Sequence, residues 1–154
     1  MGYNAIDLID RFIDIEERKR NILEEIYEKE AFGALKLMEK VLCSQSKKRI
    51  NNYKELKEKL RGKELEDIDV LTYDKMSFLI NEFNNRIYNY NTESIKEYLK
   101  SWLSVEKDNY SLFIDIQGRL VNNTSNKSIE TYKILSEIIE MENKEVTSLE
   151  KILK

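Results

Sequence analysis

The sequence predicts an all-α protein, and three observations indicate this class. The chain of 154 residues has no proline and four glycines, fewer than short strands and their turns normally need. Apolar residues recur at the 3.6-residue period of a helix over four long stretches. Hydrophobic residues make up 41% of the chain and charged residues 36%, which suits helices with one buried and one solvated face. We therefore expect a single helical domain over residues 1–154.

The first two helices are expected at residues 5–30 and 34–60. Asn4 is a candidate N-cap residue, and Asp7 follows it three residues later, as in a capping box. A short loop separates the two helices. Gly62 lies just after the second one, where a glycine commonly ends a helix. Because the loop is short, these helices should form an antiparallel hairpin.

The last two long helices form a second candidate hairpin. The third helix begins after Thr92, a candidate N-cap, and ends at the polar loop 122–126. The fourth runs from residue 128 to the end. The long connection 61–91 carries a further apolar stripe over residues 73–88, which predicts a shorter extra helix. The sequence thus predicts two αα-hairpins joined by a long crossover that carries an extra short helix.

Composition excludes several classes of protein and site. The net charge is −3, which gives no basic footprint for nucleic acid. No apolar run approaches the roughly 20 residues that span a bilayer, and the acidic start "MGYNAIDLIDRF" does not resemble a signal peptide. We therefore expect a cytoplasmic protein. The single cysteine, Cys43, excludes an internal disulfide, and the absence of histidine removes the commonest general base.

Each long helical pattern is interrupted by polar residues near its middle. Residues three apart on a helix face the same way, and in a four-helix bundle interruptions at mid-length would meet at one level. These interruptions therefore predict one polar layer inside an apolar core. In chain order they are Glu16, Ser46 with Arg49, Glu106, and Glu142 with Glu145.

An internal near-repeat relates the two hairpins. The segment "IEERKRNIL", which contains Glu16, aligns with "VEKDNYSLF", which contains Glu106. The segment "KKRINNYKELKEKL", with Arg49, aligns loosely with "NKEVTSLEKILK", with Glu145. Two related hairpins would explain why the polar residues recur at matching positions.

This pattern resembles the ferritin-like superfamily, and within it the rubrerythrin-type domain. In that family the first and third helices each supply a glutamate, the second and fourth each supply Glu-x-x-His, and these ligands hold two iron or manganese ions. The resemblance covers nearly the whole chain. It implies a degenerate dimetal site, because arginine and glutamate replace the two histidines and serine replaces one glutamate. The six ligand positions are Glu16, Ser46, Arg49, Glu106, Glu142 and Glu145.

Arg49 offers an explanation for the loss of the metal ligands. Carboxylates that converge in an apolar core repel one another, and burial raises their pKa values. A guanidinium at the same level would neutralise them by bidentate pairing, and Arg20 would help if it faced inward. Three interpretations remain open: a metal-free salt-bridged core, a residual carboxylate-only metal site, or glutamates on a solvated face.

Two functions are compatible with these residues. The first is a non-enzymatic ferritin-like bundle without a cofactor, which acts as a partner-binding or structural protein through self-association or contact with another protein. The alternative is an iron- or manganese-binding oxidoreductase with a rebuilt carboxylate site. No catalytic residue is assigned, and the orientation of Arg49 distinguishes the two functions. If Arg49 points to the core, protein atoms fill the site; if it extends to solvent, four carboxylates remain for a metal.

Overall fold

The computed structural model describes residues 2–29, 33–87, 94–123 and 130–154. It confirms the all-α class, because its regular elements are helices, accompanied in the described ranges by one isolated bridge between Tyr3 and Ile68. The predicted helix bounds are close to the observed ones. The helices are α1 (Ala5–Lys29), α2 (Ala34–Leu60), α3 (Val70–Arg86), α4 (Ile95–Asn123) and α5 (Glu130–Leu153).

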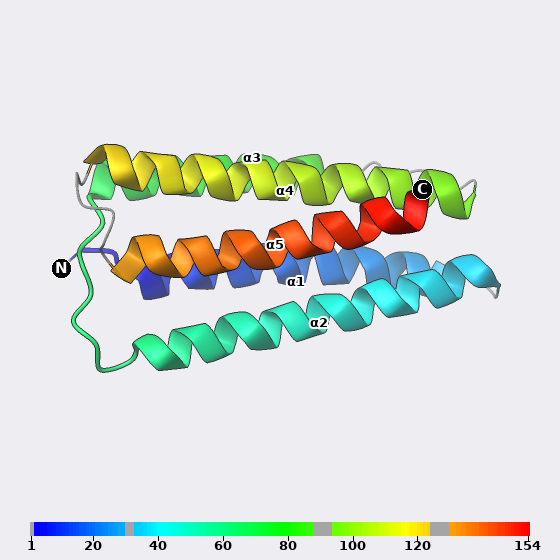
Figure 1. Ribbon diagram of the computed structural model, residues 1–154, viewed down its shortest axis with the longest axis horizontal. Coiled ribbons are helices and arrows are strands. Elements are labelled where there is room, and N and C mark those ends of the chain that lie inside the picture. Colours follow the sequence, from blue (N-terminus) through cyan, green and yellow to red (C-terminus); the bar gives the residue numbers. More distant parts are fainter. Residues whose placement is uncertain (1, 30–32, 88–93, 124–129) are drawn as a thin grey trace.

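The long helices form two antiparallel hairpins, α1 with α2 and α4 with α5 (Figure 1). The crossover from α2 includes α3, which runs along the length of the bundle and packs against α4 and, less extensively, α1. The backbone N–H of Ile68 donates a hydrogen bond of 2.6 Å to the Tyr3 carbonyl. This bond ties the N-terminal segment to the crossover at one end of the bundle.

Local capping explains where several helices begin and end. The Asn4 side chain accepts the Ile6 N–H at 2.9 Å, and the Asp7 carboxylate accepts the Asn4 N–H at 2.9 Å, so the predicted capping box is present. Asp69 caps α3 by accepting the Thr72 N–H at 3.2 Å. After α2, Gly62 adopts a φ of 79°. This is a left-handed conformation that residues other than glycine rarely adopt.

The start of α4 differs from the prediction. Ser94 accepts the Glu97 N–H at 3.1 Å, and the helix begins at Ile95. The predicted cap, Thr92, lies outside the described residues, as does the predicted start of the last helix at Ser128. The side chains at 27–29, 35 and 121–123 are likewise outside the description.

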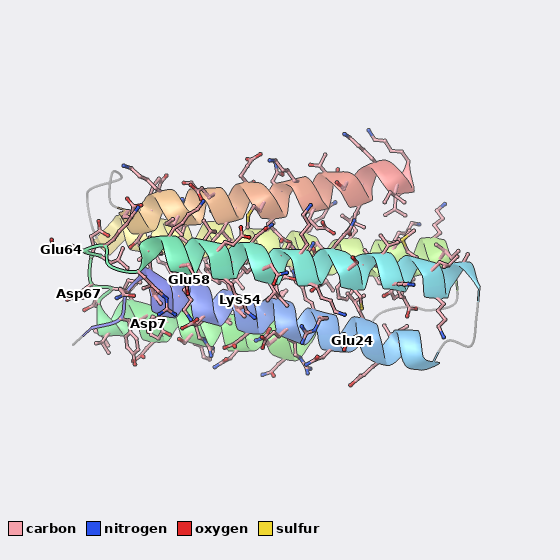
Figure 2. The ribbon with its side chains drawn as sticks, turned by 90° about the horizontal axis from the view of Figure 1, so that it is seen from below. Asp7, Glu24, Lys54, Glu58, Glu64 and Asp67 are labelled. Carbon is pink, nitrogen blue, oxygen red and sulfur yellow. The ribbon has the colours of Figure 1, made fainter. Side chains whose placement is uncertain are left out.

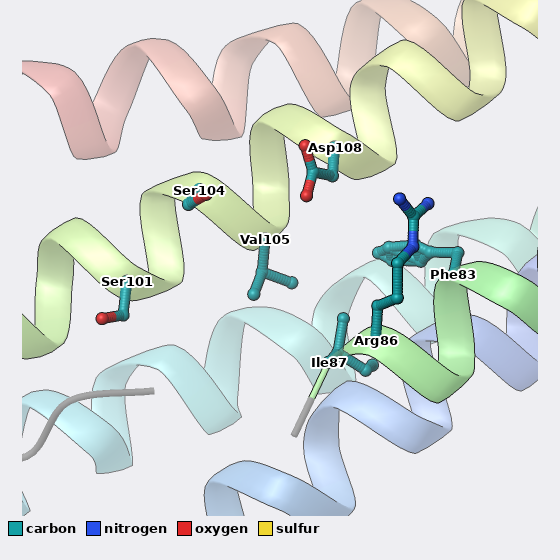
Figure 3. A pocket seen from close by; sticks show the side chains of 7 residues that line it. All are labelled: Phe83, Arg86, Ile87, Ser101, Ser104, Val105 and Asp108. Carbon is teal, nitrogen blue, oxygen red and sulfur yellow. The ribbon is translucent and has the colours of Figure 1, made fainter. Parts of the chain in front are cut away.

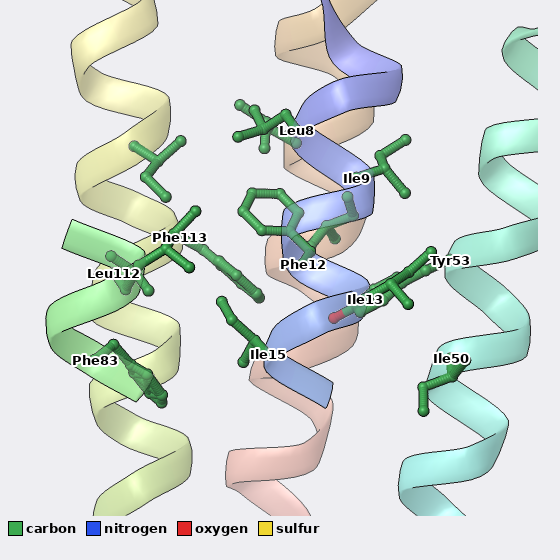
Figure 4. Packing of buried hydrophobic residues seen from close by; sticks show 14 of the residues in the cluster. Leu8, Ile9, Phe12, Ile13, Ile15, Ile50, Tyr53, Phe83, Leu112 and Phe113 are labelled. Atoms are coloured by element: carbon green, nitrogen blue, oxygen red, sulfur yellow. The ribbon is translucent and has the colours of Figure 1, made fainter. Parts of the chain in front are cut away.

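An apolar core fills the space between the helices (Figure 4). Phe12 of α1 and Phe113 of α4 are both fully buried, and their ring centroids lie 4.6 Å apart. Charged side chains cover the outer faces, among them Lys54 and Glu58 on α2 (Figure 2). Within the described part of the chain, no helix has the length and apolar character needed to cross a membrane.

The Phe12–Phe113 contact gives a test of this core. Phe12→Ala should lower the free energy of unfolding by about 3–5 kcal/mol, because it leaves a cavity where a ring was packed. The measurement is urea denaturation followed by far-ultraviolet circular dichroism. Phe78→Ala is the matched control. Because Phe78 on α3 is 52% exposed, this change should lower the free energy of unfolding much less. Equal losses for the two variants would contradict this packing.

Candidate functional site

The polar interruptions of the four long helices meet in one buried cluster. Arg49 of α2 points inward, and its guanidinium lies 3.2 Å from Glu16, 3.6 Å from Glu106 and 2.9 Å from Glu145. The Ser46 hydroxyl donates a hydrogen bond of 3.1 Å to the Glu16 carboxylate. The Arg49 side chain is 8% exposed, so the guanidinium is paired inside the bundle and does not extend to solvent.

A second cation, Lys19, lies at the centre of this cluster, and the sequence reasoning missed it. Its side chain is fully buried. The Nζ atom lies 2.9 Å from Glu16, 2.5 Å from Glu106 and 3.9 Å from Glu142. Arg20 does not meet the condition of facing inward to join this cluster, because its side chain is 30% exposed and pairs with Glu24 at 3.8 Å.

The helical period contained a signal for Lys19. Each long helix carries polar residues at positions i and i+3 in the central layer, and the near-repeat that aligns Glu16 with Glu106 also aligns Lys19 with Asn109. Asn109 is fully buried, and its amide has no hydrogen-bond partner among the residues described. The four pairs are Glu16 and Lys19, Ser46 and Arg49, Glu106 and Asn109, and Glu142 and Glu145.

The acidic side chains of the cluster differ in protonation state. Burial alone would raise the pKa of Glu16, but Arg49 and then Lys19 outweigh it and lower that pKa to about 2. Burial and the negative charge of Glu106 raise the pKa of Glu142 to about 8. Glu16 is therefore ionised and Glu142 carries a proton at neutral pH, which reduces the excess of negative charge around the two cations.

The cations are held in their charged forms by the same contacts. Burial would lower the pKa of Lys19, but Glu106, Glu142 and Glu16 raise it well above its usual range. Burial would also lower the pKa of Arg49, but the negative charges of Glu16 and Glu106 outweigh burial and raise that pKa well above its usual range. Lys19 is thus a permanent ammonium, unable to serve as a nucleophile or a base near neutral pH.

A tyrosine lies beside the cluster. The Tyr53 hydroxyl reaches from α2 toward α1 (Figure 4) and is fully buried. Burial, followed by the charges of Glu16 and Glu142, raises the pKa of Tyr53 well above its usual range. The hydroxyl has no hydrogen-bond partner in the part of the chain that is described. It therefore keeps its proton and presents a free polar oxygen close to the carboxylates.

The cluster does not fit a dimetal centre as the chain stands. Such a centre needs ligands from α2, where Ser46 and Arg49 stand in the expected positions. The Lys19 ammonium lies between Glu16 and Glu106. Over the described ranges, no group of three or more His, Cys, Asp or Glu residues is arranged to hold a metal ion.

The buried cysteine is not a nucleophile. Burial and the nearby Glu24 charge raise the pKa of the Cys43 thiol to about 11. A thiol reacts as its thiolate, and very little thiolate exists at neutral pH with such a pKa. The chain also has no histidine to accept its proton.

A surface pocket of about 210 Å³ lies between the C-terminal end of α3 and α4 (Figure 3). Val105 borders this pocket, whereas its neighbour Glu106 belongs to the buried cluster. Arg86 and Asp108 place opposite charges on its walls. Two serine hydroxyls also line the pocket. Its lining residues are Phe83, Arg86, Ile87, Ser101, Ser104, Val105 and Asp108.

No protein-family model, curated protein or solved structure matches this chain. The resemblance to ferritin-like proteins consequently depends on the residue pattern and not on measured similarity.

Two adjacent cations of α1 provide a matched test of the cluster. Lys19→Met should lower the free energy of unfolding by about 3–5 kcal/mol, because it leaves buried carboxylates without their cation. Arg20→Met should change that free energy by less than about 1 kcal/mol, since the Arg20–Glu24 pair is partly exposed. Equilibrium urea denaturation at pH 7 compares the two variants. A Lys19→Met protein as stable as Arg20→Met would contradict the buried cluster.

The protonated carboxyl of Glu142 predicts how stability depends on pH. Its pKa rises on folding from a usual value of 4.5 to about 8, so the folded state holds a proton that the unfolded state releases. The stabilising contribution of this proton is complete below pH 4.5 and is lost as the pH rises through 8. The free energy of unfolding should fall by at most about 1.4 kcal/mol for each pH unit in this range.

Glu142→Gln supplies the control, because the amide has the shape of the protonated acid and does not titrate. Between pH 5 and 9, urea midpoints of the wild-type protein should fall more steeply than those of Glu142→Gln. Parallel curves would show that Glu142 does not hold the proton.

Proposed function

We propose that this protein is a non-enzymatic, metal-independent bundle of the ferritin-like type, and that it acts as a partner-binding or structural protein. The observation that carries this proposal is the Lys19 ammonium, which lies within 4 Å of carboxyl groups from α1, α4 and α5. Together with Arg49 it supplies the positive charge that metal ions would otherwise provide. The cluster then stabilises the fold and performs no chemistry.

The arrangement of the helices supports the ferritin-like part of this proposal. Two antiparallel hairpins are joined by a crossover that carries α3 along the bundle. This is the connectivity of a bundle with one long crossover. The polar layer lies halfway along all four long helices, where that architecture builds its cofactor sites.

The groups available for catalysis support a non-enzymatic role. Lys19 keeps its proton, the Cys43 thiol is buried, and the chain has no histidine. The oxidoreductase alternative needs an Arg49 that extends to solvent and leaves the carboxylates free. The inward, paired Arg49 argues against that alternative.

A function through surfaces requires exposed groups that a second protein can cover. The described residues include large apolar side chains that are at least half exposed on three helices. On α2 they are Leu37 and Val41, on α3 they are Val70, Leu71 and Phe78, and on α5 there is Ile152. Partner contact, either with a second copy of the chain or with another protein, would bury such side chains.

Metal analysis tests this proposal. The protein is purified without a histidine tag or chelator, incubated anaerobically with Fe(II) or Mn(II), desalted and measured by mass spectrometry. We expect no metal above background, because Lys19 and Arg49 already neutralise the carboxylates. One or two retained ions per chain, as a dimetal site would hold, would contradict the proposal if Glu106→Ala abolished the retention.

A further inference from the structure

We propose that the outer face of α3 is a dimer interface, through which two copies of this chain pair antiparallel about a two-fold axis beside Phe78. The inference rests on the proposed function through surfaces, and it names the partner as a second copy of the chain. Leu71, Lys75, Phe78 and Glu82 form this outer α3 face. They are four and three residues apart along the helix and therefore lie on one side of it.

The first argument is the exposure of apolar side chains on this face. Leu71 is 78% exposed and Phe78 is 52% exposed. The opposite side of α3 carries the buried residues Tyr73, Met76 and Phe83, and the helix packs there against α4 and α1 (Figure 1). Solvated helix faces normally carry polar residues, and neighbouring exposed apolar side chains mark contact sites. The outer α3 face is therefore suited to contact with a second molecule.

The second argument concerns the two charges that accompany these apolar residues. Lys75 and Glu82 are exposed, and neither forms an ion pair within the part of the chain that the structure describes. The Lys75 Nζ atom lies 5.1 Å from the centroid of the Phe78 ring, which keeps the positive charge beside the apolar stripe. Seven residues, nearly two turns, separate Lys75 from Glu82. The two charges thus lie on the same flank of the stripe, with Phe78 halfway between them.

This spacing makes the outer α3 face complementary to itself. A two-fold dimer brings the same surface of both copies together. If the axis passes beside Phe78, the two helices run in opposite directions, and Lys75 of one copy lies level with Glu82 of the other on the same flank. Both ion pairs then form by symmetry, and the two Phe78 rings meet at the axis. Charges that flank a helix–helix contact select partner and orientation in this way.

The same charges exclude the parallel arrangement of the two helices. Parallel pairing in register would place Lys75 opposite Lys75 and Glu82 opposite Glu82, and like charges repel each other. α3 has 17 residues and is about 25 Å long, so one helix pair buries less area than a standard stable interface. We therefore expect a reversible dimer with a Kd of roughly 10–100 µM.

Charge reversal separates this interface from other modes of association. Lys75→Glu and Glu82→Lys each place like charges opposite one another, and each should raise Kd at least about tenfold. The double variant Lys75→Glu/Glu82→Lys exchanges the charges and should dimerise like the wild-type protein. Glu140→Lys is the matched control, because Glu140 is an exposed residue of α5 and the change of charge equals that of Glu82→Lys. This control should leave Kd unchanged.

The two single variants should also associate with each other. The Lys75→Glu copy carries two negative charges on the flank and the Glu82→Lys copy carries two positive ones, so antiparallel pairing gives two ion pairs. The measurement is sedimentation equilibrium of the untagged full chain, from about tenfold below to tenfold above the expected Kd. It is applied to each variant and to the equimolar mixture of the single variants. All substituted side chains are exposed, and circular dichroism checks that each protein is folded.

Three results would overturn the inference. A wild-type chain that stays monomeric over this range would do so, as would single variants that dimerise as tightly as the wild-type protein. Failure of the two single variants to associate in the mixture would exclude the antiparallel contact. These outcomes are distinct from a failure of the proposed function. A dimer that retains metal ions would contradict the metal-independent function alone, whereas a metal-free monomer would contradict the interface alone.

Discussion

Four acidic side chains at one level of a helical bundle impose the constraint on which the rest of this structure depends. Glu16, Glu106 and Glu142 are fully buried and Glu145 is nearly so. Carboxylates this close together would push the helices apart unless positive charge or protons neutralised them. The chain uses both means, since Lys19 and Arg49 bring the charge and Glu142 keeps a proton. The helices can then close over an apolar core on both sides of the polar layer.

This solution has a functional consequence. A metal ion can be lost, exchanged or reduced, and a site that holds one supports chemistry. Lys19 and Arg49 are covalent parts of the chain, with pKa values held above their usual ranges. In the function that we propose, these two side chains neutralise the core in place of metal ions, and the polar layer is a structural element. The function that we propose is therefore carried by the outer faces of the helices.

Much of the fold could be predicted from the sequence, because helical period, capping residues and the lack of proline are local signals. The capping box at Asn4 and the stop at Gly62 illustrate this. The place of Arg49 in an apolar stripe left two orientations open, and its ion pairs with Glu16 and Glu145 show that it points inward. Lys19 was missed because it neighbours Arg20, and which of two adjacent cations faces inward depends on a helix rotation of about 100°. The proton on Glu142 and the α3–α4 pocket depend on contacts between distant segments, which no local pattern encodes.

The most direct test of the central claim is a titration of the lysine side chains by nuclear magnetic resonance. In the wild-type protein, one ammonium group should remain protonated and protected from solvent exchange at a pH where the other lysines have titrated. Its signal should be absent from a protein that lacks Lys19. If all lysines titrated together and exchanged rapidly with water, no lysine would lie inside the carboxylate cluster, and the account of the core given above would be wrong.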